Sequence, residues 1–110
     1  VKGSNILNLG ITFKENCPDV RNTKAVDVIN NLRSYGANIT TYDPWASQEE
    51  VDHEYGLLTT KELPNSKFDA IVLTVAHKEF SNIDLKSMLK PDGVIYDVKG
   101  ILQDRANGRL

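Results

Sequence analysis

The eight-residue run FDAIVLTV, at positions 68–75, constrains the fold of this chain more than any other feature. It is mostly apolar on both faces, whereas a strand with one solvent-exposed face alternates apolar and polar residues. A strand of this kind is covered on both sides and belongs in a parallel sheet. Each fully buried side chain in this run, such as Ile71 or Val72, would stabilise the fold by about 1.5–3 kcal/mol.

The rest of the chain alternates between strand-like and helix-like patterns. Strands are predicted at 5–11, 38–42, 57–59 and 94–98, and helices at 23–35, 46–54 and 84–90. Asn22 or Thr23 can cap the first helix, Gly36 can end it in a left-handed turn, and residues 91–93 suit a further turn. The alternation predicts a single-domain, doubly wound (Rossmann-like) α/β fold, with three layers around a parallel sheet of about five strands.

Length, charge and cysteine content exclude several classes of protein. The 110 residues suit one domain, and the net charge of -2 argues against non-specific nucleic-acid binding. No apolar stretch approaches the ~20 residues of a membrane span, and the first residues lack a signal-peptide profile. One cysteine cannot form an internal disulfide, so a cytoplasmic location is expected, with neither nucleic acid nor membrane as a partner.

Four segments are predicted to meet at the carboxyl ends of the strands, where open parallel sheets bind ligands. They are residues 10–23 (here called the first crossing), Asp43, residues 76–80 and residues 97–100. The first crossing lacks the G-x-G-x-x-G turn of dinucleotide-binding domains, because no second glycine follows Gly10. Asp43 either bonds a ribose hydroxyl or simply forms a turn with Pro44.

The first crossing carries cationic residues where a dinucleotide-binding domain has a glycine-rich turn. Lys14, Arg21 and Lys24 precede or begin a helix, where free N–H groups favour an anion such as a phosphate. An arginine can hold a phosphate bidentately. Alternatively, Glu15 and Asp19 pair with these cations on a solvated surface, and spacing alone leaves both interpretations open.

Four further side chains are ambiguous. Cys17 has cations nearby that would lower a thiol pKa, but no base is close in sequence, and one cysteine with two distant histidines predicts no metal site. His77 is either a ligand contact or a surface histidine at a helix start. Trp45 is a platform for a ring or packs on its own domain. Lys99, a cation at the end of the last strand, suits an anion.

Several motifs in sequence order resemble one family. The segments GITFKENCPDVRNTKAVDVINNL, YDPWA, VLTVAHKEF and VIYDVKGIL resemble the C-terminal domain of the UDP-glucose/GDP-mannose dehydrogenase family. The form KENCPDVRNTK is similar to the branch that oxidises UDP-N-acetylglucosamine or UDP-N-acetylgalactosamine. The resemblance covers essentially the whole chain, so residues 1–110 are expected to be the UDP-sugar-binding domain of a longer enzyme.

The resemblance implies specific roles. Such enzymes oxidise the C6 hydroxyl of a nucleotide sugar to a carboxylate with NAD, and their nucleophilic cysteine, catalytic lysine and NAD-binding domain lie in preceding regions. Cys17 is then not the nucleophile, no catalytic residue is expected here, and the chain alone is expected to be inactive. Phe13, Lys14 and Lys99 would bind the substrate, and Arg21 would reach the NAD phosphates. Lys99 stands where many relatives have an arginine, so the bidentate contact is lost.

Partners and alternatives follow from the same resemblance. The expected partners are a UDP-sugar and the enzyme's own N-terminal and central domains, with a monomeric isolated domain and a homodimeric or larger parent. A different class of function is a stand-alone nucleotide-binding or regulatory module with no dehydrogenase activity. A third interpretation is an assembly domain, which would show no nucleotide-induced chemical shifts at Lys14, Arg21 or Lys99.

Overall fold

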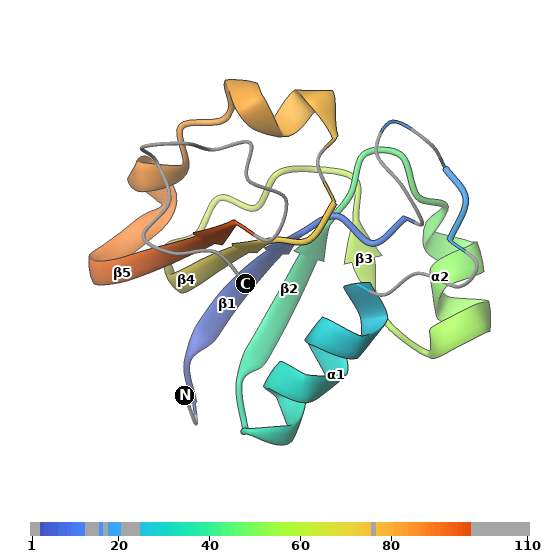
Figure 1. Ribbon diagram of the computed structural model, residues 1–110, viewed down its shortest axis with the longest axis horizontal. Helices are drawn as coiled ribbons and strands as arrows, with labels where there is room; N and C mark the ends of the chain where they lie inside the picture. Colours follow the sequence, from blue (N-terminus) through green and yellow to red (C-terminus); the bar gives the residue numbers. More distant parts are fainter. Residues whose placement is uncertain (1–2, 13–15, 17, 21–24, 76, 98–110) are drawn as a thin grey trace.

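A computed structural model describes residues 3–12, 16, 18–20, 25–75 and 77–97 (Figure 1). Five parallel strands form one sheet: β1 (Asn5–Leu9), β2 (Asn38–Tyr42), β3 (Thr59–Thr60), β4 (Phe68–Leu73) and β5 (Leu89–Asp97). Their spatial order is β3-β2-β1-β4-β5. The chain therefore winds outward from β1 in one direction and from β4 in the other, which confirms the predicted doubly wound fold.

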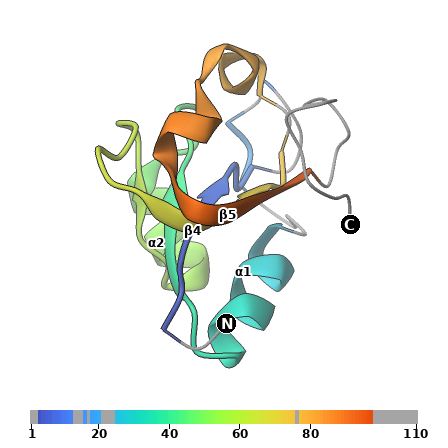
Figure 2. The same ribbon diagram turned by 90° about the vertical axis from the view of Figure 1, so that its left-hand side faces the viewer.

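Helical segments cover both faces of this sheet. The helix α1 (Ala25–Ser34) lies on one face, and the 3-10 helices η1 (Lys78–Asn82) and η2 (Leu85–Met88) lie on the other (Figures 1 and 2). The helix α2 (Gln48–Tyr55) lies at the β3 edge (Figure 1). None of the helices in the described part of the chain has the length and apolar composition that crossing a membrane requires.

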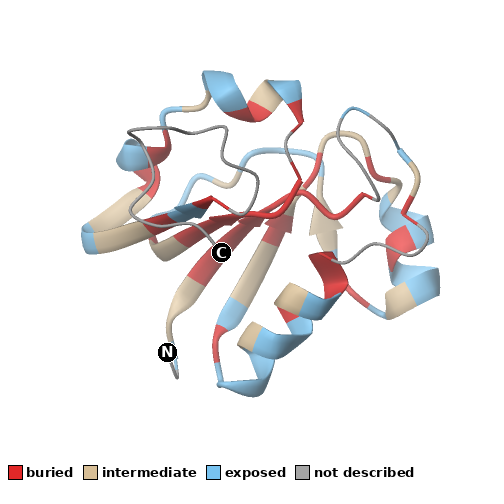
Figure 3. Cartoon of the chain, in the orientation of Figure 1, coloured by how far each residue is buried: buried red, intermediate tan, exposed pale blue. Residues whose placement is uncertain are grey.

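The core is divided between the two faces, as the run at 68–75 predicts. Leu7, Ile71 and Leu73 pack with Phe80 and Leu85 in one buried cluster. The neighbouring Val72 packs in another cluster with Ile6 and Ala37, and with the α1 side chains beside it. Burial is concentrated along β1 and β4 at the centre of the sheet (Figure 3).

The ends of the two α-helices follow from local chemistry. Gly36, at φ 87°, lies in the left-handed turn that ends α1, as predicted. Ser47 caps α2 by accepting a hydrogen bond from the N–H of Glu50, and Gly56 ends the same helix at φ 64°. Asn22 and Thr23, the predicted caps of α1, lie outside the described residues.

Two predictions near the last strand are wrong. The helix predicted at 84–90 is only the 3-10 helix η2, because the chain from Leu89 onward pairs with β4 as β5. The turn predicted at 91–93 is an irregularity within β5, with a shift in register and Asp92 at φ 66°. An aspartate tolerates positive φ, so the strand absorbs the extra residues as a bulge and does not end there.

Candidate functional site

The site begins where β1 ends, at Gly10. Gly10 has φ 97°, and a Cβ placed on it would lie 2.5 Å from the Cβ of Val75. The buried Thr74 hydroxyl lies 2.6 Å from the Gly10 carbonyl, which also accepts a hydrogen bond from the Asn8 side chain. The chain thus leaves β1 in close contact with the chain leaving β4, at the point where the strand order reverses.

Asp43, directly after β2, has its carboxylate turned into the protein. One oxygen, Oδ2, accepts hydrogen bonds from the N–H groups of Ile11 at 2.7 Å and Thr12 at 3.3 Å. The other, Oδ1, accepts from the N–H groups of Trp45 at 2.7 Å and Ala46 at 3.0 Å. With no exposed surface and these donors on both oxygens, Asp43 holds its own turn and the start of the first crossing. A ribose hydroxyl has no access to it.

His77 is the side-chain partner of Asp43. Its Nε2 lies 3.0 Å from Asp43 Oδ2 and 3.1 Å from the Thr12 hydroxyl, and its Nδ1 accepts a hydrogen bond of 2.9 Å from the Asn16 N–H. A nitrogen that accepts from an amide carries no proton, so these contacts assign the proton to Nε2 and make the imidazole neutral. The ring has no exposed surface.

The pKa of Asp43 reflects two opposed effects. Burial raises it, because a carboxylate loses hydration in the interior. The hydrogen bonds from His77 and from the backbone N–H groups of Ile11 and Trp45 stabilise the ionised form and lower the pKa below its ordinary value of 3.8. Asp43 is therefore a carboxylate at neutral pH.

Asn16, in the middle of the first crossing, is held at the same place. Its backbone, at φ 54°, donates to His77, and its side-chain oxygen accepts a hydrogen bond of 2.8 Å from the Lys78 N–H. Thr12, nearer its start, is held by Asp43 and His77. Contacts from Asp43, directly after β2, and from His77 and Lys78 at the start of η1 thus hold the chain on both sides of residues 13–15.

Trp45 packs on its own domain, as one of its two interpretations predicts, and does not serve as an open platform for a ring. Its ring stacks on His77 with centroids 6.0 Å apart, and its Nε1 donates a hydrogen bond of 2.9 Å to the Glu79 carboxylate. The Lys78 ammonium lies 5.7 Å from the centre of the same ring. Trp45 therefore shields the His77 ring and contributes to holding it in place.

The predicted meeting of segments at the sheet's carboxyl edge is confirmed for Thr12 and Asn16 of the first crossing, for Asp43 and for residues 77–79. His77 does precede a helix, η1, as one interpretation predicts, but it lies on neither the surface nor a ligand-accessible face, since it is buried against Asp43. Sequence reasoning missed Thr12 and Asn16 altogether. The chemical signal was an acid after one strand and a histidine after another, but no local pattern pairs residues so distant in sequence. The predicted substrate contacts Phe13, Lys14 and Lys99 and the predicted cofactor contact Arg21 lie outside the described residues, as do Cys17 and Lys24. Their roles stay predictions.

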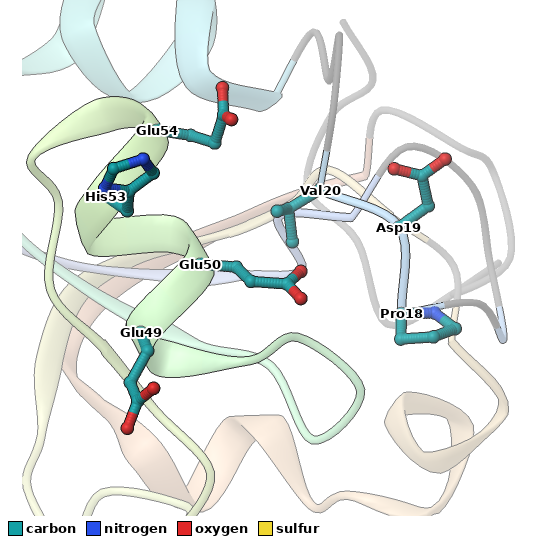
Figure 4. Close-up of a pocket in the computed structure, with 7 residues that line it drawn as sticks. All are labelled: Pro18, Asp19, Val20, Glu49, Glu50, His53 and Glu54. Atoms are coloured by element: carbon teal, nitrogen blue, oxygen red, sulfur yellow. The ribbon is translucent and has the colours of Figure 1, made fainter.

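A hollow of about 820 Å³ lies beside this site, between residues 18–20 and α2 (Figure 4). Among the described residues that line it, four are acidic: Asp19 on one side and Glu49, Glu50 and Glu54 on the other. Among the described residues there is also no group of three side chains that could hold a metal ion.

Comparison with known proteins gives a consistent result. Residues 7–104 match the model described as "UDP-glucose/GDP-mannose dehydrogenase family, UDP binding domain". The chain is 43% identical to UDP-N-acetyl-D-glucosamine 6-dehydrogenase of Salmonella typhi, over 93% of the chain and 25% of that protein. It is 41% identical to the enzyme of the same name from Pseudomonas aeruginosa, over 100% of the chain and 27% of that protein.

Solved structures agree on the fold. That of the UDP-D-ManNAc dehydrogenase from Pyrococcus horikoshii superposes with a TM-score of 0.77 at 22% identity, covering 98% of this chain and 25% of that one. That of a UDP-glucose dehydrogenase from Pyrobaculum islandicum gives 0.74 at 21% identity, with coverages of 99% and 25%. The chain thus spans about a quarter of the length of the relatives it matches. From the match over residues 7–104, the chain belongs to the UDP-glucose/GDP-mannose dehydrogenase family.

Proposed function

We propose that residues 1–110 are the UDP-sugar-binding domain at the C-terminus of a longer NAD-dependent dehydrogenase. Its substrate is a UDP-N-acetylhexosamine, whose C6 hydroxyl is oxidised to a uronate in two successive hydride transfers. The match of residues 7–104 to a UDP binding domain carries the proposal. The names of the two relatives that are 43% and 41% identical support the choice of sugar.

The proposed substrate contacts are Phe13, Lys14 and Lys99, with Arg21 reaching toward the NAD phosphates. The described frame supports this assignment, because Thr12 and Asn16 are held at the carboxyl edge where doubly wound sheets bind ligands. Cations fixed at this edge would hold the diphosphate. Binding energy from this unreacting part of the substrate can then position the distant C6 for reaction.

NAD does not fit this domain in the usual way. The glycine turn that lets a pyrophosphate approach the backbone is missing after Gly10. Both carboxylate oxygens of Asp43 already accept hydrogen bonds from protein N–H groups. In the proposed enzyme, NAD accepts the hydride while bound mainly by an N-terminal domain that precedes these residues. The domain described here supplies binding and orientation of the UDP part.

The test is NADH formation by the complete polypeptide that contains this chain. UDP-N-acetylglucosamine, UDP-N-acetylgalactosamine, UDP-glucose and GDP-mannose are offered in parallel with NAD. About two NADH per molecule of an acetylated UDP-sugar is the expected result, since alcohol-to-carboxylate oxidation removes two hydrides. No NADH from any of the four, with folded protein, would favour the stand-alone nucleotide-binding module in place of the dehydrogenase.

A single substitution tests the site within that enzyme. Lys14→Ala is expected to lower kcat/KM for the UDP-sugar by about tenfold to a hundredfold, the loss of one charge-assisted hydrogen bond. Thermal stability is expected to stay close to that of the unsubstituted enzyme. Lys86→Ala, on the exposed surface of η2, is the matched control and should leave kcat/KM unchanged. Equal kinetics for both variants would contradict the assignment of Lys14.

A further inference from the structure

The buried imidazole of His77 joins two segments that are far apart in the sequence. Its Nε2 faces the Asp43 carboxylate at 3.0 Å, and its Nδ1 receives the Asn16 N–H at 2.9 Å. A carboxylate on one ring nitrogen fixes the tautomer, so the other nitrogen is left as an acceptor. Asp43 therefore prepares His77 to accept a hydrogen bond at Nδ1 and at no other atom.

The orientation of this ring is strongly determined. Trp45 stacks on it, and Phe80 packs edge-on with ring centroids 5.3 Å apart. The ring has no exposed surface. A side chain that is fixed by neighbours on several sides can hold a mobile partner at a defined distance, because it does not move to follow that partner.

The partner at Nδ1 is a backbone group in an uncommon conformation. Asn16 has φ 54°, in the left-handed region, which asparagine adopts more readily than most non-glycine residues. Two contacts hold it there, and both come from adjacent residues: the His77 ring accepts its N–H, and the Lys78 N–H donates to its side chain. Asn16 follows Lys14 by two positions in the sequence.

We propose that His77 is a positioning residue for nucleotide-sugar binding, which it serves by holding the Asn16 backbone through Nδ1. The inference rests on the proposed function, since Phe13 and Lys14 are the expected substrate contacts. The bond between Asp43 and Nε2 is structural in this arrangement. The bond between Nδ1 and Asn16 is the one that affects the ligand.

Two amide substitutions separate these bonds. His77→Asn keeps an acceptor near the position of Nδ1 and loses the donor to Asp43. His77→Gln keeps a donor near the position of Nε2 and loses the acceptor for Asn16. If the inference is correct, His77→Asn retains UDP affinity despite its lower stability, whereas His77→Gln weakens UDP binding by about tenfold, the worth of one hydrogen bond.

The experiment measures the dissociation constant for UDP by titration calorimetry on the complete polypeptide, with thermal midpoints for each variant. Ile6→Ala is the control for destabilisation, because Ile6 is buried near the amino end of β1, away from this site. It should lower the thermal midpoint and leave UDP affinity unchanged. Selective ¹⁵N labelling of histidine adds a direct readout: in the unsubstituted protein Nδ1 of His77 should have the chemical shift of an unprotonated ring nitrogen.

Each remaining outcome contradicts the inference in a different way. Equal UDP affinity in His77→Asn and His77→Gln, whether retained or lost, would show that the acceptor at Nδ1 has no specific role. A protonated Nδ1 in the labelled protein would exclude the bond from Asn16. Absence of UDP binding by the unsubstituted protein would instead overturn the proposed function, and with it the inference that depends on that function.

Discussion

At the scale of single residues, Asp43 has a structural role at a position where dinucleotide-binding domains have a ligand-binding carboxylate. It stands at the end of the second strand, where a carboxylate in a dinucleotide-binding domain bonds a ribose. Here the side chain turns inward and accepts hydrogen bonds from Ile11 and Trp45, among others. A buried carboxylate is stable only when donors replace its lost hydration, and this one has them on both oxygens. Asp43 therefore organises the site without binding the ligand.

Replacing this carboxylate should be costly. Asp43→Asn puts an amide NH₂ where only acceptors fit, and leaves two buried N–H donors without an acceptor. The free energy of unfolding is therefore expected to fall by about 2–6 kcal/mol, at about 1–3 kcal/mol for each unsatisfied donor. Urea unfolding followed by circular dichroism measures the loss. Asp52→Asn, an equal change at an exposed position of α2, should alter stability by less than about 0.5 kcal/mol. A similar small change for Asp43→Asn would refute the role given to the carboxylate.

The same residue should make stability depend on pH. Because folding lowers the pKa of Asp43, its contribution is present above the ordinary value of 3.8 and is lost as pH falls through the lower folded value. The thermal midpoint should therefore fall as the pH is lowered below about 4. In Asp43→Asn this part of the dependence should be missing, so the two proteins should differ less at low pH than at pH 7. Parallel curves would contradict the lowered pKa.

At the scale of elements, the contact between the ends of β1 and β4 fixes the path of the first crossing. Gly10 combines positive φ with a close approach to Val75, so it meets two requirements that other residues fail. The bonds of Thr74 and Asn8 to the Gly10 carbonyl satisfy this buried backbone group outside any strand ladder. The first crossing therefore begins in a defined direction.

Gly10→Ala should test both requirements together. Backbone strain and the clash with Val75 are expected to reduce the free energy of unfolding by about 2–5 kcal/mol. Gly56→Ala, at φ 64° with open space around its position, should cost only about 1–2 kcal/mol from strain alone. Chemical unfolding of the two variants provides the comparison. Equal losses would mean that the approach of Val75 does not matter.

Elements also show where sequence patterns are informative. The central strand at Phe68–Leu73 was predictable because burial on both faces leaves a continuous apolar run. The segment at 84–90 was not, because Leu85 and Met88 have helical spacing but form one turn of 3-10 helix before pairing with β4 takes over. Local spacing cannot report that competing pairing, since the partner lies earlier in the chain.

At the scale of the whole molecule, the chain covers about a quarter of the length of the relatives it matches. In the proposed enzyme the nucleophilic cysteine and the NAD-binding domain precede these residues. A homodimeric or larger parent stays a prediction, as do a monomeric isolated domain and a cytoplasmic location. Light scattering on the complete polypeptide and on the isolated chain would measure the two states of assembly.

The isolated chain provides the corresponding prediction. The 110 residues alone, supplied with NAD and a UDP-N-acetylhexosamine, should form no NADH, because in the proposed enzyme the chemical groups for oxidation belong to other domains. UDP should nevertheless shift NMR signals of Asn16 and of its neighbours at the carboxyl edge. Signals of β1 near Ile6, at the opposite end of the strand, serve as the internal control. NADH formation by the isolated chain would contradict the division of roles.

The sequence by itself determined the fold class, the approximate strands and the edge at which the segments meet. Strand burial and helix periodicity appear as hydrophobic patterns among residues that are close in sequence. Its motifs also pointed to the family. Only the tertiary structure decided that Asp43 faces inward, that His77 is its buried partner, and that Asn16 is held by both residues 77 and 78. The physical reason is sequence distance: these contacts join residues more than thirty positions apart. They exist only once the parallel sheet has brought its strand ends together.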